Sequence, residues 1–265
     1  MPPETPPGTP PSEQAASPPP LDGRDEAERW LRVLGLLLLT GAGYYLIGLS
    51  TDLTRARELR TRLDDAIPFV PQSEFLYFAV YTMMLYPAFV VRDLPLFRRV
   101  TLAYLVVIVL SLACFALFPV HAVGLRADPA RLDPHVFWEW GVRTHYHLDP
   151  PTNMFPSLHL SIAVLAGLAG FSARPAFGWC AAPLVAGIAV AICTVKQHFV
   201  LDGVAGFLLG AGAWAALVRR CPEAALPEAT RARTWAGPAA FLAFTLAVYG
   251  AMYVAWRLGW QPWVG

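Results

Sequence analysis

Residues 153–202 read NMFPSLHLSIAVLAGLAGFSARPAFGWCAAPLVAGIAVAICTVKQHFVLD. Polar motifs open and close this stretch, and the apolar residues between them suffice for two membrane crossings of about 20 residues each. Two crossings return the chain to the membrane surface from which it started. We therefore expect the two motif histidines, His159 and His198, to face each other at one membrane surface.

The rest of the chain continues this apolar pattern. Of its 265 residues, 56% are hydrophobic, and the long apolar runs predict an all-α, polytopic membrane helix bundle. Hydropathy predicts six core transmembrane helices plus a seventh, with the second and fourth short and Pro87 able to kink the second. The expected spans lie near residues 30–49, 75–91, 100–120, 157–173, 176–195, 199–218 and 236–256.

The chain divides into a tail and one domain. Residues 1–23 are rich in proline and nearly free of apolar side chains, so we expect them to be disordered. Residues 24–265 are predicted to form the transmembrane domain. Its long polar connection, 121–156, predicts an interfacial helix near residues 134–142, and the connection 51–72 predicts another surface helix.

Charge and cysteine spacing limit the partners. A net charge of +1 gives no basic surface for nucleic acid, so the membrane and a lipid substrate are the expected partners. The four cysteines lack metal-ligand spacing, and we predict neither a metal nor a cofactor. The distribution of arginines favours a plasma or inner membrane location with the motif face on the non-cytoplasmic side. The oligomeric state is left open.

The second motif predicts a nucleophile. His198 and Asp202 are four residues apart, which would place them on one helix face, with the carboxylate holding one ring nitrogen protonated. The other nitrogen would then be free to attack phosphorus. Gly206 and Gly210 follow at GxxxG spacing, which favours the close approach of a neighbouring helix. A purely structural His–Asp pair is the alternative.

The first motif predicts a phosphate site at a helix start. Pro156 precedes Ser157, whose hydroxyl and the free backbone N–H groups of the first turn form an anion cradle. His159, within the first turn, is placed to donate a proton to a leaving oxygen. Lys196, the single lysine of the chain, is a candidate for stabilising phosphoryl charge. A snorkelling lysine at a helix end is the alternative.

These two motifs resemble the second and third signature motifs of the type 2 phosphatidic acid phosphatase superfamily. Their residues, 155–159 and 197–202, are similar to the sequences of its inositolphosphotransferase and sphingolipid-synthase-like branch. The resemblance covers residues 118–210. It implies a metal-independent membrane bundle acting on lipid phosphates, with His198 as the phosphohistidine nucleophile, His159 protonating the leaving group, Asp202 orienting the nucleophile and Ser157 contacting phosphate.

The chain lacks basic residues that the superfamily motifs usually contain. The first signature motif, a lysine followed seven residues later by Arg-Pro, is absent, and Ile192 replaces the arginine usual six positions before the nucleophile. Phosphate-binding cations must therefore come from elsewhere. The candidates are Arg126, Lys196 and Arg143, among which the sequence does not choose.

Three functional hypotheses follow. The leading one is an integral-membrane lipid phosphate phosphatase or phosphotransferase; water as acceptor gives the first and an alcohol gives the second. The alternative from another class is a non-catalytic scaffold or lipid transporter that uses the same bundle. A soluble-type metal hydrolase ranks below both. It would be inactivated by chelators and insensitive to His198→Ala, the opposite of the phosphohistidine prediction.

Overall fold

The computed structural model describes residues 22–220 and 235–264. The predicted tail, residues 1–23, lies outside the described part except for its last two residues. The described residues are helical, with a single isolated β-bridge between Arg57 and Val120. The helices are α1 (Gly23–Ser50), α2 (Arg62–Ala66), α3 (Glu74–Met83), α4 (Tyr86–Val90), α5 (Leu94–Leu117), α6 (Phe137–Leu148), α7 (Leu158–Ala173), α8 (Pro175–Thr194), α9 (Val200–Ala213), which continues as a π-helical turn (Trp214–Val218), and α10 (Ala236–Arg257); single 3₁₀ turns cover Pro71–Ser73 and Pro129–Arg131.

Seven apolar segments are found where seven spans are predicted. Five helices of the described residues are long and apolar enough to cross a membrane, namely α1, α5, α8, α9 with its π-helical extension, and α10. The fourth segment, α7, is apolar but has only 16 residues. The prediction of an all-α, multi-pass membrane bundle is confirmed by this architecture.

The second apolar segment is broken, as its proline suggests. It forms α3 and then α4, with Met84 and Leu85 between them. Pro87 lies in the first turn of α4, where its missing N–H costs no helical hydrogen bond. The Leu85 N–H turns back to the Thr82 carbonyl at 2.9 Å. The break redirects the chain, so that α4 packs against α7 and α10 while α3 packs against α8.

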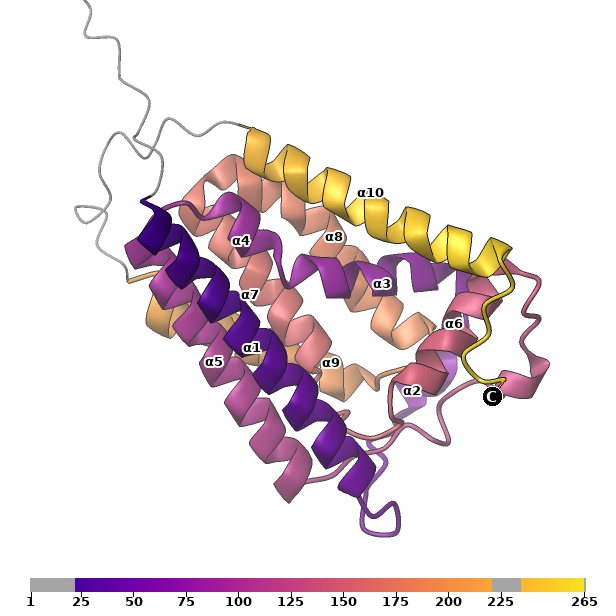
Figure 1. The fold of residues 1–265 in the computed structure, drawn as a ribbon. Helices are drawn as coiled ribbons and strands as arrows, with labels where there is room; N and C mark the ends of the chain where they lie inside the picture. Colours follow the sequence, from indigo (N-terminus) through magenta and orange to yellow (C-terminus); the bar gives the residue numbers. More distant parts are fainter. Residues whose placement is uncertain (1–21, 221–234, 265) are drawn as a thin grey trace, which may run out of the picture.

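Helix α7 is the centre of the bundle. It packs against α8, α9, α5, α4 and α3, and almost all of its residues are buried. Helix α1 runs along α5 on one side, and α10 lies across α3, α4 and α6 on another (Figure 1). The outward faces of α1 and α10 expose leucines and aromatic residues, as expected of surfaces that contact lipid.

The connections form the polar end of the bundle. Helix α6 begins three residues later and ends six residues later than the predicted interfacial helix, 134–142. The predicted surface helix in 51–72 is reduced to the five residues of α2. A capping box starts α2, because the Asp64 carboxylate accepts from the backbone N–H and hydroxyl of Thr61 at 2.7 and 2.6 Å.

Candidate active site

Two glycines set the distance between the motif helices. A side chain at Gly206 would lie 2.5 Å from the backbone oxygen of Ser157, and one at Gly210 would overlap the backbone oxygen of Ser161. Helices α7 and α9 therefore approach to backbone contact, as the GxxxG spacing predicts. The Ser157 N–H donates to the backbone oxygen of Asp202 at 2.9 Å, which ties the start of α7 to the first turn of α9.

This packing brings the three predicted catalytic residues together. His159 Nδ1 lies 3.3 Å from His198 Nε2. On the other side of the same ring, His198 Nδ1 lies 3.5 Å from Asp202 Oδ2, an ion-pair distance longer than a good hydrogen bond. His198 and Asp202 are buried, and His159 is half-buried. The expectation that both motif histidines face each other is confirmed by these contacts.

His198 is not on the same helix face as Asp202, in contrast to the prediction from their spacing. Helix α9 begins at Val200, so His198 precedes it. The reason is capping of the helix N-terminus. Asp202 Oδ2 accepts from the Phe199 N–H at 2.9 Å, so the helix begins at the next residue, Val200. The carboxylate still lies behind the His198 ring, and its Oδ1 is buried without a hydrogen-bond partner.

Ser157 is the N-cap of α7, so a helix does start at the first motif. Its side-chain oxygen accepts from the Leu160 N–H at 3.4 Å, and the residue is buried. The hydroxyl therefore lies at the helix start, two residues before His159. This is the position that an anion cradle requires.

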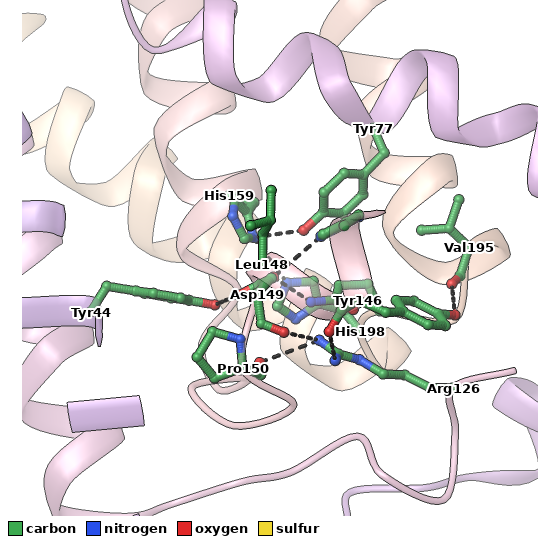
Figure 2. A network of polar contacts seen from close by, with 12 residues as sticks. Tyr44, Tyr77, Arg126, Tyr146, Leu148, Asp149, Pro150, His159, Val195 and His198 are labelled. Carbon is green, nitrogen blue, oxygen red and sulfur yellow. Dashed lines mark hydrogen bonds and ion pairs between the residues drawn. The ribbon is translucent and has the colours of Figure 1, made fainter. Parts of the chain in front are cut away.

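Arg126 lies beside the site, where its side chain hydrogen-bonds the backbone at the end of α6 and in the loop that follows. Its guanidinium donates to the backbone oxygens of Tyr146, Asp149 and Pro150 at 3.2, 3.0 and 3.2 Å, and its Nε has no hydrogen-bond partner among the described residues (Figure 2). The same guanidinium lies 4.8 Å from the centre of the Tyr146 ring. Figure 2 shows Arg126, one of the three candidate cations, in the same polar network as both motif histidines.

The other two candidate cations are bound elsewhere. Lys196 Nζ donates to the backbone oxygens of Asp64 and Ile67 at 2.8 and 2.5 Å, so it fastens α2 and the residue after it to the start of the second motif. The guanidinium of Arg143 lies 4.5 Å from the centre of the Trp263 ring, near the C-terminal residues. Neither contact involves a motif histidine.

A tyrosine from α3 completes the surroundings of His159. The Tyr77 hydroxyl lies 3.0 Å from His159 Nδ1, the same nitrogen that faces His198 (Figure 2). Tyr77 is fully buried, and its ring packs on the His145 ring with the centroids 4.1 Å apart. Tyr77 thus links the motif histidines to a second polar cluster.

This second cluster, which we call the Glu74–His145–Asp149 network, is buried under the site. His145 Nδ1 lies 3.1 Å from Glu74 Oε1, and its Nε2 lies 3.2 Å from Asp149 Oδ2. The Tyr44 hydroxyl donates to Asp149 Oδ1 at 2.7 Å, and Gln197 Nε2 donates to Asp149 Oδ2. The network therefore connects α1, α3 and α6 to the residue that precedes His198.

Charge within the network is arranged in opposite signs. Burial acts to lower the pKa of His145, but the adjacent carboxylates of Glu74 and Asp149 outweigh it and raise this pKa to about 9. Burial acts to raise the pKa of Asp149, yet the hydrogen bond and charge of His145 and the charges of His159 and Arg126 hold it below its usual range. At neutral pH His145 is cationic and Asp149 anionic.

This network is not among the sequence-based expectations, although the sequence carries two signals for it. His145 and Asp149 have the same four-residue spacing as His198 and Asp202. Glu74 is an acidic residue at the very start of an apolar segment, where a charge needs a partner. The pair His145 and His147 does not point to a common ligand, because His145 is buried and His147 is exposed.

The fold and site define a class of protein: a multi-pass helical bundle that brings two histidines and an aspartate together at the end of two tightly packed helices. The family is identified by its sequence, since the family model described as the PAP2 superfamily matches residues 67–216. The chain belongs to the PAP2 superfamily, which indicates a phosphatase or phosphotransferase type of enzyme acting on lipid phosphates. The curated proteins and the solved structures contain no match to this chain.

Proposed function

We propose that the chain is an integral-membrane lipid phosphatase or phosphotransferase that works through a phosphohistidine on His198 and needs no metal. The observation that carries the proposal is the line of contacts from Asp202 through both nitrogens of His198 to His159, at 3.5 and 3.3 Å. An acid behind one nitrogen and a second histidine before the other is the arrangement of an oriented nucleophile and a general acid.

The geometry supports a definite order of events. Asp202 holds the proton of His198 on Nδ1, which leaves the Nε2 lone pair free to attack phosphorus. His159 then gives a proton to the oxygen of the departing alcohol as its bond to phosphorus breaks. In the second half, His159 takes a proton from water or from an acceptor alcohol, and that oxygen attacks the phosphohistidine and releases His198.

The two ring nitrogens must separate before this chemistry. At 3.3 Å they are in contact, whereas a reacting phosphorus needs about 3–3.5 Å on the nucleophile side alone. His198 is buried between α8 and α9, whereas His159 is half-buried and lines a pocket of about 160 Å³. Entry of the phosphate is therefore coupled to movement of His159.

The transferase-like branch is part of the proposal. The absent first signature motif and the Leu158 variant of the second support an inositolphosphotransferase or sphingolipid-synthase-like enzyme, with phosphate contacts from Ser157 and Arg126. Lys196 and Arg143 stay predicted contacts, although each has another partner. We further propose a plasma or inner membrane location with the site on the non-cytoplasmic face.

The test is turnover by purified protein in detergent with EDTA. The panel holds labelled lipid phosphates and phosphodiesters, each with and without diacylglycerol or ceramide as acceptor. His198→Ala should abolish turnover, while His135→Ala, which changes an exposed histidine, should leave it unchanged. Released inorganic phosphate identifies a phosphatase, and an acceptor-dependent lipid product identifies a phosphotransferase.

Two outcomes would contradict the proposal. Turnover that EDTA abolishes and His198→Ala retains indicates a metal-dependent hydrolase. No turnover across the panel favours the non-catalytic scaffold or transporter.

A further inference from the structure

An apolar pocket of about 160 Å³ ends at His159. One wall comes from α1, the opposite wall from α3, and α7 forms the floor between them; Figure 1 shows α7 between these two helices. The last residues of α6 close one end, with Leu148 and Asp149. We call this the α1–α3 pocket.

The mouth of the α1–α3 pocket opens on the lipid-facing surface. Tyr45, Tyr81 and Leu148 line the pocket and are 47%, 41% and 45% exposed. Beyond them, the outer face of α1 exposes a row of leucines. The pocket thus leads from a surface that contacts hydrocarbon to the histidine that is predicted to protonate the leaving oxygen.

Most polar groups of the pocket already have partners. Both oxygens of Asp149 accept hydrogen bonds, from Tyr44 on one side and from His145 and Gln197 on the other. The Tyr45 hydroxyl donates to the Leu148 backbone oxygen at 2.9 Å.

Tyr81 is the exception. Among residues 22–220 and 235–264, no group hydrogen-bonds its hydroxyl. Its ring lies edge-on to the His159 ring, with the centroids 5.9 Å apart. Tyr81 and His159 line the same pocket, so a free tyrosine hydroxyl there is a suitable partner for one polar atom at the end of a hydrocarbon chain.

We propose that the α1–α3 pocket binds the alcohol part of the lipid substrate, with the hydrocarbon chain between α1 and α3 and the ester oxygen at His159 and the Tyr81 hydroxyl. This inference rests on the proposed function. When His198 Nε2 bonds to phosphorus, the bond from phosphorus to the ester oxygen breaks and that oxygen takes the proton of His159. The product is a long-chain alcohol, still in the pocket, which leaves sideways into the bilayer.

Gly41 offers a way to fill the pocket without disturbing the helix. It lines the pocket on the same face of α1 as Tyr44 and Tyr45, and an added Cβ meets no atom within 4 Å. Gly35, on the same helix, is equally open but does not line the pocket. Gly41→Leu and Gly35→Leu are therefore a matched pair.

The first measurement is the hydrolysis of hexadecyl phosphate in detergent. Gly41→Leu should lower kcat/KM by about tenfold or more, because methylene contacts in the pocket are lost, while Gly35→Leu stays near wild type. Tyr81→Phe should lower it by roughly three- to tenfold through the loss of one hydrogen bond. Tyr253→Phe, which changes an exposed tyrosine of α10 that does not line the pocket, is its control. Equal values for Gly41→Leu and Gly35→Leu overturn the inference.

The second measurement needs no turnover. A hexadecanol that carries a photoreactive diazirine should label wild type and Gly35→Leu on α1 or α3, and should label Gly41→Leu much less. If the wild type is inactive on every lipid phosphate but shows this labelling pattern, the proposed function fails and the pocket stands. If Gly41→Leu is labelled as strongly as the wild type, the proposal that the pocket binds the alcohol is wrong.

Discussion

Two histidine–aspartate pairs with the same four-residue spacing lie in one molecule, and their surroundings differ. His145 has a carboxylate at each ring nitrogen, 3.1 and 3.2 Å away, and is completely buried. His198 has a carboxylate at one nitrogen only, and its other nitrogen faces His159. A histidine with an acidic partner at each nitrogen donates from both and keeps no lone pair, whereas a histidine with an acidic partner at one nitrogen has its other nitrogen facing another group.

The two pairs differ in how many hydrogen bonds their carboxylates accept, which fits a structural role for Asp149 and the proposed reactive role for Asp202. Asp149 accepts three hydrogen bonds, from Tyr44, His145 and Gln197, while Asp202 leaves one oxygen without a partner. The Glu74–His145–Asp149 network holds three helices and Gln197 in place, and Gln197 is the neighbour of His198. Spacing alone therefore does not identify a nucleophile; the number of partners at its ring nitrogens does.

The largest expected effect is on the rate, at the reactive pair. Asp202→Asn keeps an oxygen for the Phe199 N–H but removes the charge that fixes the proton on His198, so kcat should fall on the order of 10³- to 10⁴-fold. Turnover of labelled lipid phosphate measures this. A thermal unfolding midpoint close to wild type is the control for folding. A near-normal kcat for Asp202→Asn would show that Asp202 only caps the helix and does not orient His198.

The next effect is on stability, at the structural pair. Asp149→Asn removes one of the two carboxylates that flank the buried His145 ring, and breaking a buried pair costs about 3–5 kcal/mol. The thermal unfolding midpoint in detergent should fall clearly. Asp128→Asn, in an exposed pair with Arg131, should change little. Equal shifts for Asp149→Asn and Asp128→Asn would contradict the assignment of a stabilising network.

The smallest effect is the pH dependence of stability. The pKa of His145 is raised in the folded protein to about 9, from about 6.5 in an unfolded chain. Its stabilisation is fully present below about pH 6.5 and is lost as the pH rises through about 9. The unfolding midpoint should therefore decrease from pH 6.5 to 9.5, and His145→Gln should flatten that decrease. The lowered pKa of Asp149 acts in the opposite direction, since its contribution is lost only in strong acid.

The bundle and the proximity of the two motif histidines could be predicted from the sequence because both depend on local patterns. Apolar run length located the seven segments, Pro87 located the break, and Gly206 and Gly210 predicted the close approach of α7 and α9. The two histidines met because two crossings return the chain to one surface. Each of these inferences needs only residues within one segment or between two adjacent ones.

Contacts between distant segments were not predictable in this way. The network joins residues 44, 74, 145, 149 and 197, which no short motif contains. Lys196 was expected near phosphate, but carbonyls that end α2, more than a hundred residues earlier, hold its ammonium. Arg143 stacks on Trp263 at the far end of the chain. Which partner a long basic side chain binds depends on the whole fold. The roles of Lys196 and Arg143 toward phosphate stay predictions.

The shortness of α7 has a consequence for the membrane itself. With 16 residues it is about 24 Å long, less than the roughly 30 Å of a typical hydrocarbon layer. Either the bilayer thins around the bundle or the end that bears His159 is recessed below the headgroups. A thicker host bilayer should then change how far a lipid headgroup must descend to reach His198.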